Sequence, residues 1–256
     1  DFQDHGFGFT LCSSQFCKGL MLQPIQPIQP TGEPRRSKSD PPGFGALTSL
    51  LAANAVTFGC WSVANGREDG QMRNAMLRHF LCSRSHLQQG RWHTLLTSCI
   101  FHQRFAHCMF NTCALWTVGR IAAEHLTNVE LAGLFAACGL GSSGGHVLLH
   151  RRPVLGASGM LMGVFTTSSM LQPERRLSVV APFEGWMSIA DLSHVFVAVN
   201  CMGYALRRHP LFQHVAWAAH IAGATAGYGV GWLAYFAGDQ RFADPLAIHK
   251  KTARMM

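Results

Sequence analysis

Two short segments, far apart in the chain, each place one reactive side chain among small or apolar residues. Ser158 stands in a Gly-Ala-Ser-Gly sequence, between Gly156 and Gly159, at the start of an apolar run that reaches residue 171. His220 stands in a later apolar run and is followed by glycines at positions 223, 227 and 231. A serine and a histidine that meet can act as the nucleophile and general base of acyl transfer. They are the first candidates for chemistry, provided that the fold brings them together.

Glycine spacing gives both runs a surface on which helices can approach closely. His220 and the three glycines after it are spaced by 3, 4 and 4 residues, so they share one helical face. Gly159 and Gly163 form a matching surface, and small residues four apart let membrane helices pack backbone to backbone. Such packing would bring His220 to Ser158, in a first helical turn whose backbone N–H groups favour negative charge. A small-residue motif alone is also typical of simple helix packing, and the added histidine favours a catalytic site.

A third group of polar residues lies near the start of another apolar run. His107 and Asn111 are four residues apart, which puts both hydrogen-bonding side chains on one helical face, and His102 precedes them by five residues. At ~1.5 Å of rise per residue, Ser158, His220 and this pair lie at similar depth, roughly 5–12 Å below one surface. We expect a single site. The alternative is a polar pair that only joins helices.

Composition predicts an all-α, polytopic membrane protein. Charged residues make up 13% of the chain, about half the usual share of a soluble protein, and the 48% hydrophobic residues form long blocks. A soluble helical bundle would need charged helix faces, which these runs lack. The net charge of +8 comes without a Lys/Arg-rich block interleaved with aromatics, so nucleic acid is not an expected partner. Basic residues that flank membrane spans explain the charge, and the lipid bilayer is the expected partner.

Apolar runs divide the chain into a leader, a membrane core and a tail. Residues 1–43, with a Pro repeat, are expected to be extended or disordered, 44–238 form the core, and 239–256 form a basic tail. Residues 66–91 read as a polar connection, and 92–104 as a segment too short to cross that dips into the bilayer edge. The six predicted spans cover about residues 44–65, 105–124, 126–149, 154–171, 185–206 and 212–237. Basic residues are balanced between the two sides, so the orientation stays open.

In combination these motifs resemble the rhomboid family of intramembrane serine proteases. The matching elements are the six-span core, His-x-x-x-Asn in the second span, Gly-x-Ser-Gly opening the fourth, and Ala-His-x-x-Gly-x-x-x-Gly in the sixth, over about residues 44–238. The segments 92–98, 114–116 and 155–159 are similar to the mitochondrial, presenilin-associated rhomboid-like branch. The resemblance implies a six-transmembrane-helix bundle, integral and multi-pass, in the mitochondrial inner membrane. It also implies a serine-type endopeptidase whose partners are single-span membrane proteins, cut near where they enter the bilayer.

The resemblance also implies a role for each candidate residue and requires neither a metal nor an organic cofactor. Ser158 would be the nucleophile and His220 its general base. Asn111 and His107, with the Ser158 N–H, would stabilise the oxyanion. The expected water and substrate positions are His102, Gly156 and Gly159.

Two departures and two alternatives remain. Many bacterial members carry a tyrosine four residues after the serine, where this chain has Met162, so we expect another support for His220, such as a sulfur contact. The extra span that usually precedes the core in the mitochondrial branch is not visible.

One alternative function is a catalytically silent relative that binds and escorts membrane clients, although such members typically lose the serine or histidine. The other is a transporter or metal channel, suggested by 14 histidines, but no ligand cluster is visible in the sequence.

Overall fold

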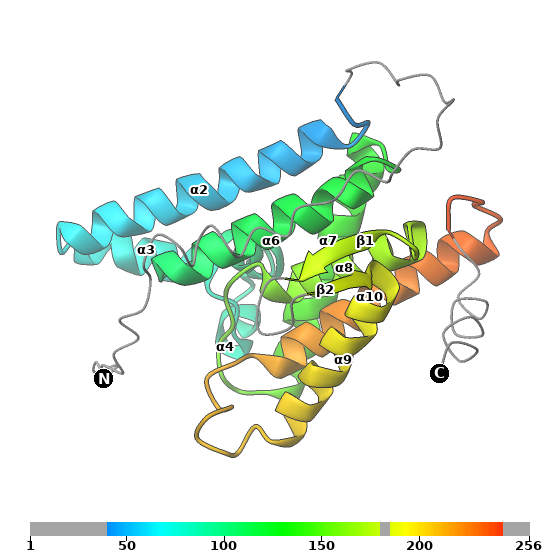
Figure 1. Cartoon of the computed structure of the whole chain (residues 1–256). Coiled ribbons are helices and arrows are strands. Elements are labelled where there is room, and N and C mark those ends of the chain that lie inside the picture. Colours follow the sequence, from blue (N-terminus) through cyan, green and yellow to red (C-terminus); the bar gives the residue numbers. More distant parts are fainter. Residues whose placement is uncertain (1–39, 180–184, 243–256) are drawn as a thin grey trace.

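The described residues form a helical bundle with a small two-stranded antiparallel sheet (Figure 1). The computed structural model describes residues 40–179 and 185–242, so most of the predicted leader and the end of the predicted tail lie outside the described residues. The long helices are α2 (Phe44–Gly66), α6 (Phe105–Ala123), α7 (Asn128–Leu149), α8 (Ser158–Leu171), α9 (Ile189–Ala205) and α10 (Trp217–Phe236). The short elements are α3 (Gly70–Phe80), α4 (Arg84–Gln88), α5 (Thr94–Thr97), the 3-10 turn η1 (Ser98–Ile100), β1 (Arg176–Val179) and β2 (Gly185–Ser188).

Each predicted span corresponds to one long helix, and the mostly helical fold class is confirmed. By length and composition, α2 and α7 are apolar enough to cross a membrane, and α9 is a shorter apolar helix. Figure 1 shows α2 lying along the outside of the bundle, where most of its apolar surface is left uncovered. The number of crossings stays a prediction of six.

Three predicted helix starts were four or five residues too early. The fourth, fifth and sixth spans were expected from about residues 154, 185 and 212, but α8, α9 and α10 begin at Ser158, Ile189 and Trp217. The polar connection predicted over residues 66–91 contains two short helices: Asp69 and Ser83 cap α3 and α4, their side chains accepting from backbone N–H groups of the first turn. The predicted fifth span began at residue 185, but β2 pairs antiparallel with β1 and the helix begins only at Ile189. Ser188 provides the cap there, since its hydroxyl accepts from the N–H of Asp191 at 3.0 Å.

Helix α8 is the centre of the bundle, packed against α6, α7, α9 and α10. Every residue from Gly159 to Leu171 is buried. Its hydroxyl side chains are satisfied by carbonyl oxygens: Thr166 donates to Ala224 O at 3.0 Å, and Thr167 to Gly227 O at 2.9 Å. These bonds tie α8 to α10, and thereby fix the helix whose first residue is Ser158.

The glycine faces of α8 and α10 meet as predicted. A Cβ added to Gly223 would lie 1.9 Å from Gly159 O, and one added to Gly227 would lie 2.0 Å from Gly163 O. No side chain fits at such a separation, so the two backbones are in direct contact. This contact sets the rotation of both helices and turns Ser158 and His220 toward each other.

Candidate active site

The side chains of Ser158 and His220 meet at one end of the α8–α10 contact. His220 Nε2 lies 2.8 Å from Ser158 Oγ, which is hydrogen-bond distance. Ser158 is the first residue of α8, so the backbone N–H groups at this helix start have no acceptor within the helix. A serine hydroxyl, a ring nitrogen and free N–H donors are therefore concentrated in one place.

The far side of the His220 ring is held by a residue that the sequence interpretation did not assign to the site. Asn200, in α9, places its Oδ1 2.6 Å from His220 Nδ1. The amide orientation is fixed because Asn200 Nδ2 donates to Phe196 O at 2.7 Å, which leaves the oxygen facing the histidine. An amide oxygen only accepts, so Nδ1 carries the proton and Nε2 of the neutral ring is an acceptor. That tautomer can take a proton from Ser158.

Met162 and Trp217 complete the surroundings of this chain of hydrogen bonds. The expected support for His220 was a sulfur contact, and the structure gives that role to the Asn200 amide oxygen instead. The Met162 sulfur lies 4.0 Å from Asn200 Nδ2, so it packs behind the amide. The Trp217 ring stands edge-on to His220, with centroids 6.1 Å apart. Trp217, one helical turn before His220, therefore packs against the ring, whereas Met162 packs against the asparagine that holds the ring.

Asn111 and His107 lie together on α6, on the side of the site where the serine turn passes. Asn111 is buried, and one of its amide hydrogens is donated to His107 O at 2.8 Å. The amide has a second N–H, which is available to another acceptor. The His107 ring lies against the backbone of Gly156, since a Cβ added there would be 2.6 Å from His107 Cε1.

His102 and Gly156 shape the turn that leads into Ser158. His102 is fully buried, and its Nε2 accepts from the N–H of Ala157 at 3.2 Å, one residue before the serine. Its ring stands edge-on to His107, with centroids 4.9 Å apart. Gly156 has a φ of +106°, a conformation that a side chain disfavours, and its N–H donates to Ser98 O at 2.8 Å. His102, expected to hold water, thus positions the backbone of the nucleophile.

Gly159, the other glycine expected to admit a substrate, faces neighbouring helices. A Cβ there would lie 1.9 Å from Ser142 Oγ and 3.0 Å from Ala219 O. Its neighbours in the structure are therefore α7 and α10. Gly156 alone of the two adjoins the polar residues of α6.

The residue missed by sequence reasoning, Asn200, did carry a signal. It is a polar side chain in an otherwise apolar helix, only 5% exposed, and such residues are costly unless they have a partner. Asp191 and His194 in the same helix gave the same signal, but they face elsewhere. Asp191 bonds the cap Ser188, and the His194 ring stacks on Tyr228 with centroids 6.5 Å apart. Sequence alone could not select among the three.

Comparison with known proteins identifies the family. The rhomboid domain family model matches residues 89–236. Rhomboid protein 1, mitochondrial, from Saccharomyces cerevisiae is 30% identical over 192 residues, which cover 72% of this chain and 51% of the yeast protein. Presenilin-associated rhomboid-like protein A, mitochondrial, from Danio rerio is 25% identical over 198 residues, which cover 75% and 48%. Rhomboid protease GluP from Bacillus subtilis is 34% identical over 77 residues, or 30% and 15%.

The chain spans about half the length of the mitochondrial relatives it matches. The matched domain contains every residue of the site, from His102 to His220, and it covers more than half of the chain. The expected resemblance to mitochondrial rhomboid proteins is therefore confirmed. The chain belongs to the rhomboid family.

Proposed function

We propose that the protein is an intramembrane serine endopeptidase in which Ser158 is the nucleophile and His220 the general base. The observation that carries the proposal is the continuous pair of hydrogen bonds, 2.8 Å from Ser158 Oγ to His220 Nε2 and 2.6 Å from His220 Nδ1 to Asn200 Oδ1. A base that is oriented by a third group is the usual signature of an activated nucleophile. A packing motif would not require this order of donors and acceptors.

In the first step, Ser158 Oγ attacks the carbonyl carbon of the scissile peptide bond while its proton passes to His220 Nε2. The imidazolium that forms keeps its Nδ1 proton on the Asn200 oxygen, and this bond strengthens because the ring is now charged. The negative charge on the former carbonyl oxygen faces the N–H groups at the start of α8. The second amide hydrogen of Asn111 and the ring of His107 add donors from α6.

In the second step, the C–N bond breaks and the leaving nitrogen takes the proton from His220 Nε2. This leaves an ester between the substrate acyl group and Ser158 Oγ, with His220 neutral again. Water then gives a proton to His220 Nε2 as its oxygen attacks the ester carbon. The Ser158–acyl bond breaks, the proton returns to Ser158 Oγ, and a carboxylic acid is released.

The substrates we propose are single-span membrane proteins, and the location we propose is the mitochondrial inner membrane. Two of the three relatives named above, from Saccharomyces cerevisiae and Danio rerio, are mitochondrial rhomboid proteins, which supports the location. Apolar side chains such as Val195 and Phe196 are exposed on α9, beside Asn200, which suits lipid or an apolar substrate helix. Six crossings by the long helices would make the protein multi-pass.

A reconstituted cleavage assay tests the proposal. The purified chain in liposomes should cut a single-span reporter, and Ser158→Ala should abolish cutting. A serine-directed fluorophosphonate should label the wild type but neither Ser158→Ala nor His220→Ala. Equal cleavage by wild type and Ser158→Ala would overturn the proposal. Absence of both cleavage and labelling, with a client still bound, would favour the silent escort protein.

A further inference from the structure

A cavity of 340 Å³ opens beside the proposed dyad, between the end of α7, the end of α9 and the start of α10. Its wall includes Ala216, Trp217 and Ala218, the N-cap and first two residues of α10, whose first turn also carries His220. The cavity is large enough for a polar side chain with its main chain. It takes no part in the proton transfers described above.

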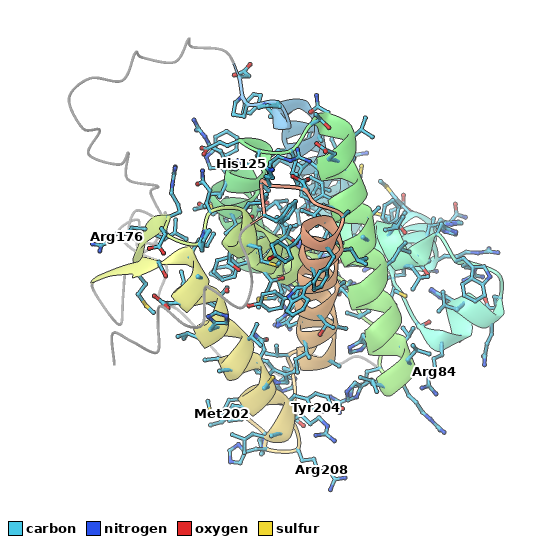
Figure 2. The ribbon with its side chains drawn as sticks, turned by 90° about the vertical axis from the view of Figure 1, so that its right-hand side faces the viewer. Arg84, His125, Arg176, Met202, Tyr204 and Arg208 are labelled. Atoms are coloured by element: carbon cyan, nitrogen blue, oxygen red, sulfur yellow. The ribbon has the colours of Figure 1, made fainter. Side chains whose placement is uncertain are left out.

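The charges around this cavity are of one sign. Arg152, Arg207 and Arg208 line it together with two histidines, and none of the described residues in the wall is an aspartate or glutamate. Two of the arginines are held in place: Arg152 donates to Gln213 O at 2.9 Å, and Arg207 lies over the Tyr204 ring at 4.3 Å. Figure 2 shows Tyr204 and Arg208 together at the foot of α9. In the described part of the chain, no carboxylate forms a salt bridge with any of the three.

His150, one of the two histidines in the wall, is affected by burial first and by the neighbouring positive charges second. Burial, with the charges of Arg207 and Arg152, lowers the pKa of His150. His150 stacks on His146, with centroids 5.3 Å apart. Among the residues that the structure describes, the cavity wall is thus positively charged without an acidic partner, which favours an anionic ligand.

His146, in the same wall, has a ring nitrogen that lacks a hydrogen-bond partner among the described residues. His146 is 5% exposed, and its Nε2 donates to Arg152 O at 3.0 Å, so Nδ1 of the neutral ring is an acceptor. Nδ1 has no hydrogen-bond partner in the part of the chain that the structure describes. This nitrogen is buried, and a main-chain N–H and a headgroup hydroxyl can both donate to such an acceptor, so it does not separate a peptide from a lipid. The position of the cavity next to the proposed dyad is what favours a carboxylate of the substrate.

Distance relates the cavity to the proposed cut. Ala218 is two positions before His220, or ~3 Å along the helix axis. The Trp217 ring, also in the wall, lies 6.1 Å from the His220 ring. An extended chain advances about 3.3–3.6 Å per residue, so a bound side chain lies roughly two to four residues from the bond attacked by Ser158.

We propose that this cavity binds an aspartate or glutamate of the substrate, close in sequence to the scissile bond, and selects substrates by that carboxylate. The inference rests on the proposed protease function for its position relative to the cut. The binding itself requires only the cavity, Arg152, Arg207 and Arg208. It can therefore be measured apart from cleavage.

The test uses single-span peptides that carry Glu or Gln at each of the five positions on either side of the cut. The full chain is reconstituted in phosphatidylcholine liposomes, and kcat/KM is measured for each peptide. At one or two positions Glu should exceed Gln by roughly 5- to 50-fold, mostly through KM. Arg152→Gln and Arg208→Gln should bring that ratio near one, and Arg208→Glu should favour Lys at the same position. Arg151→Gln is the matched control, since Arg151 neighbours Arg152 but does not line the cavity, and it should keep the ratio.

Binding of the same peptides to Ser158→Ala protein separates this proposal from the protease proposal. A Glu preference that depends on Arg208, without any cleavage by wild type, would support the cavity and overturn the catalytic function. Cleavage by wild type with equal binding of Glu and Gln peptides at every position would overturn the cavity proposal alone. Adding phosphatidylglycerol to the liposomes tests the remaining alternative, that the cavity binds a lipid phosphate. If activity depends on that lipid through Arg208 while substrate charge has no effect, the site binds a lipid phosphate and the proposal is wrong.

Discussion

Replacing Asn200 by alanine removes the acceptor that fixes the His220 tautomer and leaves Ser158 untouched. Asn200 Oδ1 lies 2.6 Å from His220 Nδ1, and in the proposed transition state this becomes a hydrogen bond to a charged ring. Such bonds contribute ~1.5–3 kcal/mol. At 1.36 kcal/mol per factor of ten in rate, Asn200→Ala should lower kcat by roughly 10- to 150-fold. KM should change little, because Asn200 does not touch the scissile bond in this mechanism.

The measurement combines steady-state cleavage with the rate of fluorophosphonate labelling, and both should fall by the same factor. Asn200→Asp keeps an oxygen acceptor and should retain more activity than Asn200→Ala. Asn54→Ala is the matched control: Asn54 is also buried, in α2, and donates to its own helix at Leu50 O, 2.9 Å away. If Asn200→Ala keeps kcat within twofold of wild type, or loses no more than Asn54→Ala, the assignment of Asn200 to the base is refuted.

Three further predictions follow from single contacts. Gly227→Val should destabilise the protein by about 2 kcal/mol or more, because a Cβ would lie 2.0 Å from Gly163 O. Gly229→Ala is the control on the same helix, since a Cβ there meets nothing within 4 Å. In a thermal-melting assay, Gly229→Ala should melt like the wild type and Gly227→Val should melt at a lower temperature. Gly156→Ala should cost about 1–3 kcal/mol at its φ of +106° and lower kcat by misplacing the serine turn; wild-type kcat with normal melting would contradict this. The Arg241 guanidinium holds the pKa of Asp239 below its usual range, so this pair stabilises the fold above the ordinary aspartate pKa and the contribution is lost as pH falls through the lowered value. At pH 7 the wild type should therefore be more stable than Asp239→Asn, by no more than about 1 kcal/mol in the free energy of unfolding, and should melt at a higher Tm. The two Tm values should converge in acid.

Much of the fold could be predicted because hydrophobicity alone marks a helix that is apolar on all sides. The long helices fall where the apolar runs predict them. Boundaries failed where polar groups outside those runs decide the backbone. The hairpin pairing that delays α9 to Ile189 depends on residues 176–179 meeting 185–188, and periodicity does not report such a pairing. The caps Asp69 and Ser83 are short-range signals in a segment that was interpreted as polar connection.

The contact between Ser158 and His220 could be predicted because spaced glycines mark the faces on which two helices can pack closely. Gly159 and Gly163 on one helix and Gly223 and Gly227 on the other allow one close approach, and that approach fixes both rotations. Once the rotations are fixed, the depths of the serine and the histidine decide whether they meet. Helix α9 has no such row of spaced glycines. Its polar residues, Asp191, His194 and Asn200, lie at three positions of a helix that contacts α8 and α10 through larger side chains, such as Phe196 against Phe165.

This difference explains why the proposed nucleophile and base could be read from the chain while the support of the base could not. Backbone-to-backbone contact is specified by the absence of side chains, which is visible in a sequence as spaced glycines. The hydrogen bond from His220 to Asn200 is specified by the packing of larger side chains, and many rotations of α9 would bury an asparagine equally well. A tyrosine at position 162, as in many bacterial members, would support the histidine from within α8 itself. With Met162 there, the support comes from a separate helix, so the tautomer of His220 depends on how α9 packs against α8 and α10.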